Sequence, residues 1–255
     1  MKVYETGNIR NIVVMGHGGC GKTTLVEAIA YQTGITARMG KVTDGNTISD
    51  YDKEEQKRQF SISTSVVPVE FEDIKINFLD TPGYFDFVGE VEEACHAAGA
   101  AVIVINGKSG VEVGTLKAWE LCEKYKLPRL FFVTGMDDDQ ASYRKIVLEL
   151  NDRFGRKVAP FHVPIRENEK FVGFVNVVKM KGRRFINDTS EYEECDIPDY
   201  MDKHLNISRD ALVEAVADTS EELMERYFAG EEFTYEEVST ALRTHVMDCQ
   251  IVPVL

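Results

Sequence analysis

Apolar residues in the first 157 positions fall into short uninterrupted runs that are separated by amphipathic segments. A short apolar run between turn residues predicts a buried strand, whereas apolar residues at helical spacing predict a helix with one apolar face. We expect strands at residues 9–15, 62–71, 74–79, 101–105 and 129–133, and helices at residues 22–33, 90–98, 113–125 and 140–154. Because strands and helices alternate, the sequence predicts an α/β fold whose mixed, mostly parallel sheet carries helices on both faces.

The pattern changes after residue 158. Short strands are expected at residues 158–164, 171–178 and 183–186, and helices at 207–217, 220–228 and 235–247, the first of them capped by Ser208. We therefore predict a core over residues 1–157, an acidic α+β insertion over residues 158–250, and a last core strand over residues 251–255. A buried strand is an unusual chain terminus, so we expect this chain to be cut from a longer protein.

The charge of the chain is large and unevenly distributed. Among 255 residues there are 29 Lys and Arg against 43 Asp and Glu, a net charge of −14. This balance excludes a bulk positive field for nucleic acid or for an anionic membrane. Between Asp188 and Glu237 there are 17 acidic and 3 basic residues. Such a stretch is either a solvated helical face or a docking surface for a basic partner.

Two further features bear on the location of the protein. The longest uncharged apolar run, Ala97–Ile105, is too short to cross a bilayer, and residues 1–5 do not resemble a signal peptide. The five cysteines are scattered without a Cys-x-x-Cys pair, which indicates neither a zinc site nor a disulfide framework. We expect a soluble, cytoplasmic protein.

The clearest chemical signal lies between the first strand and the first helix. The pattern G-x-x-x-x-G-K-[ST] is formed by Gly16, His17, Gly18, Gly19, Cys20, Gly21, Lys22 and Thr23, and Thr24 follows it. Glycines let the backbone curl so that its N–H groups surround a phosphate, and the helix adds the positive end of its dipole. Lys22 is expected to reach the β- and γ-phosphates, and Thr23 to bind Mg²⁺.

A second segment, Asp80-Thr81-Pro82-Gly83, follows the strand expected at residues 74–79. A carboxylate at the end of that strand is well placed to hold Mg²⁺, directly or through water. Gly83 has no side chain, so its N–H can approach a γ-phosphate closely. Together with the phosphate loop, this segment predicts a nucleotide switch.

The phosphate loop, the Asp80–Gly83 segment and the chain up to Val133 resemble the GTPase domain of translation elongation factor G. The acidic insertion resembles the extra subdomain of that factor, which elongation factor Tu lacks. The resemblance covers essentially the whole chain, and it makes the polar stretch Gly40–Ser65 the first switch. It places the Mg²⁺-binding hydroxyl of that switch at Ser61, with Thr64 as an alternative register.

The resemblance implies a GTPase that binds GTP, GDP and Mg²⁺ and acts in ribosomal translocation. Its partners would be the ribosome and, through the acidic insertion, the stalk protein of the large subunit; no membrane and no sequence-specific nucleic acid are expected. The alternatives are a ribosome-binding nucleotide sensor with little GTPase activity and a ribosome-protection GTPase like those that confer tetracycline resistance. A P-loop kinase or ATPase fits the Asp80–Gly83 segment less well. Measured turnover with and without ribosomes would separate the enzyme from the sensor.

Lys22, Gly83 and Tyr84 are the predicted catalytic residues, although Tyr84 departs from the family pattern. The family has histidine at this position, where it orients the attacking water. A phenol is a poor general base near neutral pH, yet its hydroxyl can still position water. Since phosphoryl transfer depends mainly on positioning and charge stabilisation, we predict slow hydrolysis. The family also has histidine at the position of His17 without a catalytic role, so we interpret His17 as structural.

Base recognition departs from the family as well. The family's Asn-Lys-x-Asp is here Thr134-Gly135-Met136-Asp137. By resemblance Asp137 still accepts hydrogen bonds from guanine and Thr134 replaces the asparagine, whereas the lysine over the base is lost. Each lost contact costs ~1–3 kcal/mol, so weakened binding is expected. The family's loop that closes over guanine would follow Leu255.

Overall fold

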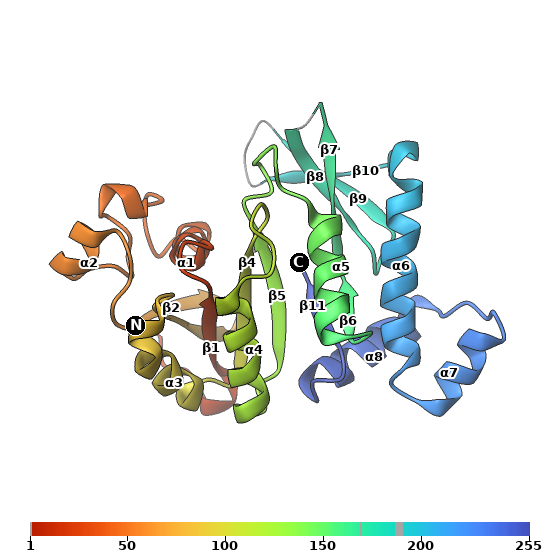
Figure 1. Ribbon diagram of the computed structural model, residues 1–255, viewed down its shortest axis with the longest axis horizontal. Helices are drawn as coiled ribbons and strands as arrows, with labels where there is room; N and C mark the ends of the chain where they lie inside the picture. The colour runs from red at the N-terminus through yellow and green to blue at the C-terminus, as the bar shows by residue number, and fades with distance from the viewer. Residues whose placement is uncertain (1, 169, 187–190) are drawn as a thin grey trace. The chain divides into compact units, whose positions relative to one another are not determined.

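A computed structural model describes residues 2–168, 170–186 and 191–255 (Figure 1). These residues form two compact units. The N-terminal unit contains residues up to 106 together with residues 112–134, and the C-terminal unit contains residues 107–111 and 135–255. The division thus falls at other residues than the expected boundary at 157/158.

The N-terminal unit is built on five strands in the order β2-β3-β1-β4-β5. The strands are β1 (Ile9–Gly16), β2 (Ser65–Phe71), β3 (Ile74–Asp80), β4 (Ala100–Asn106) and β5 (Arg129–Thr134). Neighbouring strands are parallel except β2, which runs antiparallel to β3. The edge position of β2 agrees with Pro68, because proline cannot donate a ladder hydrogen bond. The predicted mixed, mostly parallel sheet is confirmed.

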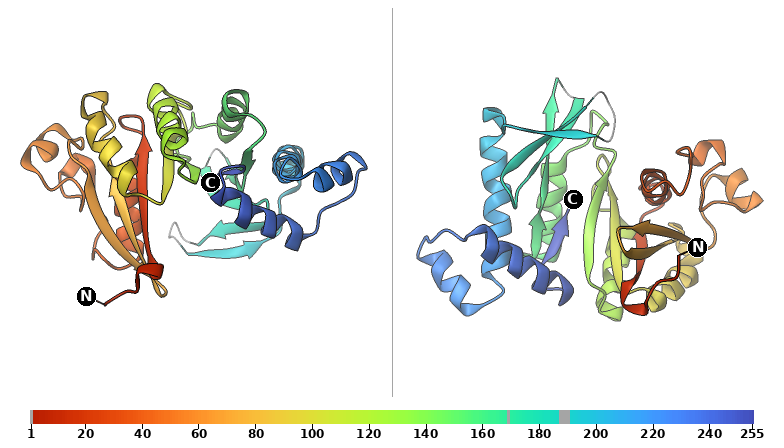
Figure 2. Two further views of the ribbon diagram at one scale, coloured as in Figure 1. Left: turned by 90° about the horizontal axis from the view of Figure 1, so that it is seen from below. Right: turned by 180° about the vertical axis from the view of Figure 1, so that it is seen from behind.

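Helices lie on both faces of this sheet. The helices are α1 (Lys22–Gln32), α3 (Val88–Ala97) and α4 (Val113–Tyr125), with the short α2 (Lys53–Arg58) outside the layers (Figures 1 and 2). Val14 of β1 packs in one cluster with Val26 and Ala30 of α1. The next residue, Met15, points to the opposite face, where its sulfur lies 3.5 Å from Cys95 of α3. Successive side chains of β1 thus point to opposite faces of the sheet, and both faces are buried under helices.

In the described part of the chain, the C-terminal unit contains one parallel strand pair, a four-stranded antiparallel sheet and four α-helices. Helix α5 (Tyr143–Phe154) packs on β6 (Val158–Pro160), which pairs in parallel with β11 (Val252–Val254). An antiparallel sheet in the order β10-β9-β8-β7 is formed by β7 (His162–Glu167), β8 (Lys170–Asn176), β9 (Lys181–Phe185) and β10 (Tyr192–Cys195). The remaining helices are α6 (Asp202–Ala217), α7 (Glu221–Phe228) and α8 (Tyr235–Met247).

Single turns of 3-10 helix occur in both units. They lie at Thr6–Asn8, Val42–Asp44, Phe85–Phe87 and Asp199–Met201.

Local expectations failed at three places. Ser208 is not a cap, because α6 already begins at Asp202 and Ser208 is buried within it. The polar stretch Gly40–Ser65, for which no helix was expected, contains α2. A capping box between Asp52 and Glu55 stabilises this helix although it has no apolar stripe. Strand β10 was missed because Glu193 and Glu194 look like solvated charges, yet they lie opposite arginines of β9.

The acidic stretch lies mainly on α6, α7, α8 and their connections. Asp188, where it begins, lies outside the described residues, as do residues 189 and 190. No helix in the described ranges has both the length and the apolar composition that a membrane crossing requires.

Candidate phosphate and magnesium site

The phosphate loop connects the end of β1 to the start of α1. Gly19 and Gly21 have φ values of +78° and +96°, which glycine adopts without strain. Gly21 is the N-cap residue of α1, and no described side chain caps this helix. The first N–H groups of α1 are therefore available to an anion.

Lys22 is held in place by the loop that it serves. Its side chain is buried, and Nζ donates to the carbonyl oxygens of Gly16 at 3.2 Å and His17 at 2.9 Å. An ammonium group has three N–H donors, and the third faces Cys20 Sγ at 3.9 Å, a weak acceptor that a phosphate oxygen can replace. The pocket at this place has a volume of about 200 Å³. It is lined by Gly18, Gly19, Gly21, Lys22, Thr23, Thr24, Val42, Gln59, Phe60, Ser61, Gly83 and Tyr84.

Three side chains from different segments meet at the start of α1. The hydroxyl oxygens of Thr23 and Ser61 are 3.2 Å apart, and Ser61 donates to Asp50 Oδ1 at 2.7 Å. All three side chains are buried. The structure thus brings the predicted pair Thr23 and Ser61 together and adds Asp50, which the sequence interpretation did not include.

Asp80 completes this group from the end of β3. It is 1% exposed, and neither carboxylate oxygen has a hydrogen-bond partner among the described residues. Asp50 Oδ2 and Ser49 Oγ are also buried without a partner there. Buried carboxylates are normally paired, because an uncompensated charge is costly to bury. Unpaired oxygen ligands of this kind fit a hard divalent cation such as Mg²⁺.

The electrostatics of the group point to the same ligand. Burial raises the pKa of Asp80 to about 6. The hydroxyls of Ser49 and Thr23, which lie nearby but form no hydrogen bond of normal geometry with Asp80, and the charge of Lys22 oppose this rise, whereas Asp50 adds to it. Burial also raises the pKa of Asp50, against the effect of the Ser61 hydrogen bond. Two carboxylates that are buried and repel each other would be stabilised by a cation between them.

The switch residue Ser61 is fixed by neighbours in the chain. The carboxylate of Glu55 accepts hydrogen bonds from the N–H groups of Ile62 and Ser63 at 2.9 and 3.1 Å. Thr64 instead points to α3, where its hydroxyl donates to the Glu90 carbonyl at 3.1 Å. Ser61, rather than the alternative Thr64, therefore lies beside Thr23.

The beginning of the same switch is fixed by α1. Glu27 is 1% exposed, and its two carboxylate oxygens accept hydrogen bonds from Gly40 N at 2.8 Å and Ile48 N at 2.7 Å. Such charge-assisted bonds are roughly twice as strong as neutral ones. The sequence interpretation missed Glu27 because a glutamate within a helix is usually solvated.

Gly83 approaches the phosphate loop so closely that a side chain would not fit. A Cβ at this position would lie 2.6 Å from Lys22 Nζ and 2.7 Å from Gly18 Cα. Thr81 anchors the segment by donating from its hydroxyl to the Val14 carbonyl at 2.7 Å. Tyr84 follows with 49% of its surface exposed and lines the pocket.

His17 faces away from the phosphate pocket. Its Nδ1 accepts a hydrogen bond from Gly114 N at 3.3 Å, and its Nε2 lies 3.5 Å from Glu112 Oε1. The ring thus ties the phosphate loop to the start of α4, and it does not line the pocket.

The two residues expected to contact the base, Thr134 and Asp137, belong to different units. Thr134 ends β5, and its hydroxyl donates to the Cys20 carbonyl at 2.6 Å, which ties β5 to the phosphate loop. Gly135 has a φ of +65°. Asp137 is exposed in the C-terminal unit.

Comparisons with known proteins identify the family of this chain. The family model of the elongation factor Tu GTP binding domain matches residues 7–240. Among solved structures, the crystal structure of a protein from Thermus thermophilus matches with a TM-score of 0.87 and 36% identity. That match covers 96% of this chain and 37% of the other, so this chain spans well under half of the length of that protein. The expected fold class and family are confirmed, and the chain belongs to the family of elongation factor Tu GTP-binding domains.

Proposed function

We propose that this chain binds and hydrolyses GTP as the GTPase domain of an elongation-factor-G-like protein that acts in ribosomal translocation. The observation that supports this most is the buried carboxylate of Asp80, which has no hydrogen-bond partner among the described residues and lies near Thr23 and Lys22, with Ser61 in contact with Thr23. This group combines a cation for phosphates with oxygen ligands for Mg²⁺. Family membership supports guanine nucleotides over adenine nucleotides.

In the proposed mechanism Lys22 and the N–H groups at the start of α1 bind the phosphates. Thr23, Ser61 and Asp80 would hold Mg²⁺, and the bound ion would supply positive charge against the phosphate oxygens. The N–H of Gly83 approaches the γ-phosphate, and the hydroxyl of Tyr84 orients the attacking water. Because a phenol is a weaker base than imidazole near neutral pH, we propose slow hydrolysis.

A titration with fluorescent GTP, GDP and ATP, with and without Mg²⁺, tests the proposal. We expect GTP and GDP to bind more tightly than ATP, and Mg²⁺ to strengthen binding. Asp80→Asn should remove the effect of Mg²⁺, whereas the matched variant Asp86→Asn, at an exposed position, should keep it. Tighter binding of ATP than of GTP would contradict the proposal.

A nucleotide sensor with little hydrolysis is the second candidate, and Tyr84 in place of histidine favours it. Single-turnover hydrolysis of labelled GTP with and without ribosomes separates the two functions. Bound GTP that persists unhydrolysed in both conditions would establish the sensor.

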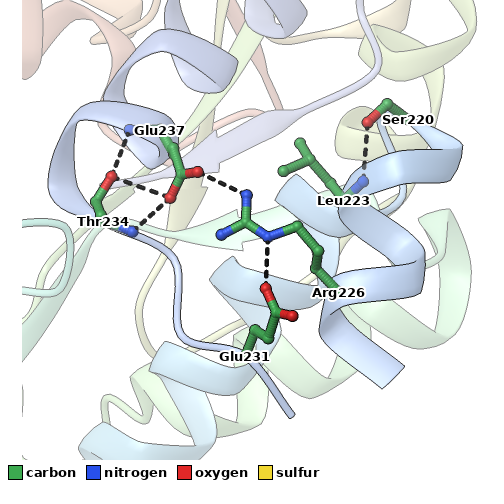
Figure 3. A network of polar contacts seen from close by, with 6 residues as sticks. All are labelled: Ser220, Leu223, Arg226, Glu231, Thr234 and Glu237. Carbon is green, nitrogen blue, oxygen red and sulfur yellow. Dashed lines mark hydrogen bonds and ion pairs between the residues drawn. The ribbon is translucent and has the colours of Figure 1, made fainter. Parts of the chain in front are cut away.

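We further propose that the acidic surface of α7 and α8 docks a basic partner, by resemblance the stalk protein of the ribosome. Figure 3 shows that part of this charge is already used within the unit. Arg226 forms ion pairs with Glu231 at 2.9 Å and Glu237 at 2.6 Å, and Glu237 also accepts a hydrogen bond from Thr234 N at 2.8 Å. Charge reversal of Glu231 or Glu237 would therefore disturb the fold as well as the surface.

A sharper test changes acidic residues that have no such internal role. Glu222, Glu232 and Glu236 form no ion pair or side-chain hydrogen bond within the described part of the chain. Reversal of these three charges should slow association with the stalk protein at low salt, because rim charges act mainly on the association rate. The control reverses Glu70, an exposed acidic residue of β2 in the other unit. An unchanged association rate would contradict docking at this surface, and the acidic stretch would then be interpreted as a solvated helical face.

A further inference from the structure

The antiparallel sheet of β7 to β10 has one buried face and one face that is partly open to solvent. Along β8, Val175 is buried, whereas its neighbour Phe174 is only half-buried. Phe174 lies opposite Arg183 of β9. Two positions further along β9, Phe185 lies opposite Tyr192 of β10. Because cross-strand partners share a face of a sheet, aromatic rings and a guanidinium group gather on the partly open face.

The rings of this face form a continuous row over three strands. We call this set the aromatic row; it consists of Phe171, Phe174, Phe185 and Tyr192. The ring centroids of Phe171 and Phe185 are 5.4 Å apart. Phe174 lies 6.1 Å from Phe185 and 6.4 Å from Tyr192. Tyr192 is 47% exposed, and the three phenylalanines are half-buried. Exposed apolar residues that are grouped, rather than scattered singly, indicate an interaction surface.

Positive charge accompanies the aromatic row. Arg183 Cζ lies 4.5 Å from the ring centroid of Tyr192 and 6.0 Å from that of Phe174. Within the described ranges Arg183 forms no ion pair or side-chain hydrogen bond, and the nearby Glu194 is paired with Lys181 at 2.9 Å. Residues 156–184 contain eight basic and two acidic residues. The segment that forms β7, β8 and β9 is therefore positive, although the chain as a whole carries a net charge of −14.

We propose that the aromatic row and Arg183 bind single-stranded RNA, with roughly two or three unstacked bases on the rings and a phosphate beside the guanidinium group. An acidic peptide would use the charge of this surface but not its rings, whereas a nucleotide offers both an anion and a flat π-face. RNA fits better than DNA because the exposed Tyr192 hydroxyl can hydrogen-bond a 2′-hydroxyl. The inference goes beyond the proposed GTPase function and does not depend on it.

A fluorescence anisotropy titration of the whole chain with a short fluorescein-labelled oligouridylate tests the proposal at low salt. Tyr192→Ala should weaken binding about tenfold, which is the range expected for the loss of one stacked base. Tyr192→Trp should keep the affinity, because it preserves an aromatic face. The control is Tyr235→Ala on α8, where the tyrosine is likewise 47% exposed, and it should bind like the parent. An absence of saturable binding by the parent, or unchanged binding by Tyr192→Ala, would overturn the proposal.

Salt dependence and competition separate the roles of ring and charge. Arg183→Gln should weaken binding and lower its salt dependence, because fewer counterions are released. Tyr192→Ala should leave the salt dependence unchanged. Arg243→Gln, at an exposed position of α8, is the matched control and should change neither quantity.

Competitors identify the class of partner. DNA of the same sequence should displace the labelled RNA from the parent less well than unlabelled RNA does, and this difference should vanish in Tyr192→Phe. Polyglutamate should displace the labelled RNA poorly. Competition by polyglutamate or by DNA that equals competition by RNA would overturn the assignment of RNA to this surface.

Discussion

Asp80→Asn should stabilise the nucleotide-free protein while it removes the response to Mg²⁺. Burial raises the pKa of Asp80 from 3.8 to about 6. Since each tenfold change in acidity corresponds to ~1.4 kcal/mol, the ionised carboxylate opposes folding by about 3 kcal/mol at pH 7. Asparagine is similar in shape and carries no charge, so most of this penalty should disappear.

The sign of the pH dependence is part of the prediction. A carboxylate whose pKa is raised on folding binds more protons in the folded state between pH 4 and 6, so stability falls as pH rises through this window. Above about pH 6 the loss is complete. The difference in the free energy of unfolding between Asp80→Asn and the parent should therefore be small near pH 4 and should reach its full value above pH 7.

Urea unfolding, followed through the fluorescence of Trp119, measures these free energies in the presence of EDTA. Asp86→Asn, at an exposed position, is the control and should follow the parent at every pH. With Mg²⁺ and GDP the order should reverse, because a ligand stabilises only the protein that binds it. An Asp80→Asn protein that is less stable than the parent at pH 8 would refute the reasoning, since the carboxylate would then have stabilising partners.

Substitutions at three further positions of the site, Lys22, Gly83 and Tyr84, test its other parts. Lys22→Ala should weaken GTP binding far more than threefold, because it removes the side-chain cation of the pocket. A change in affinity smaller than threefold in a titration would show that this segment is not a phosphate loop. Gly83→Ala should cost ~1–3 kcal/mol of unfolding free energy through crowding against Lys22 and Gly18. Gly89→Ala, in open space on α3, should cost nothing, and equal effects of the two alanines would contradict the crowding argument. Tyr84→Phe should slow GTP hydrolysis at saturating GTP with little change in GTP affinity. Tyr84→His should accelerate GTP hydrolysis in the presence of ribosomes. Unchanged rates would show that this side chain is not near the attacking water.

The sequence was sufficient for those parts of the site that depend on consecutive residues. The phosphate loop and the Asp80–Gly83 segment each follow a strand, and the conformation of a strand end is a local property. The parallel sheet was predictable for the same reason, since each strand has its own apolar run. These elements lie within a few residues of the expected positions.

The residues that were missed act over long distances in the chain. Asp50 reaches Ser61 and Glu27 reaches Gly40 and Ile48 only because the first switch folds back on α1. No spacing rule distinguishes these carboxylates from solvated ones, because their burial results from the path of a polar segment.

The base-recognition turn leads to a last prediction about selectivity. A Cβ on Gly21 would lie 3.3 Å from Thr134 Oγ1, so the phosphate loop passes close to the Thr134 side chain. The short side chain of threonine fits this limited space. Gly135 follows with a φ of +65°, a conformation that costs a lysine ~1–2 kcal/mol. The left-handed backbone at position 135 thus explains why glycine replaces the family's lysine there. Restoring lysine at this position alone should strain the turn.

Asp137 remains as the proposed contact that distinguishes guanine. Hydrogen bonds to one carboxylate are worth ~1.5–3 kcal/mol, which corresponds to a preference for GTP over ATP of roughly 10- to 150-fold. Asp137→Ala should abolish this preference in competition titrations, whereas Asp139→Ala, at an exposed position two residues further, should preserve it. The combined change Thr134→Asn with Gly135→Lys should tighten GTP and GDP but not ATP, at a measurable cost in unfolding free energy. If the parent prefers GTP more than a thousandfold, or if Asp137→Ala keeps the preference, residues other than Asp137 read the base.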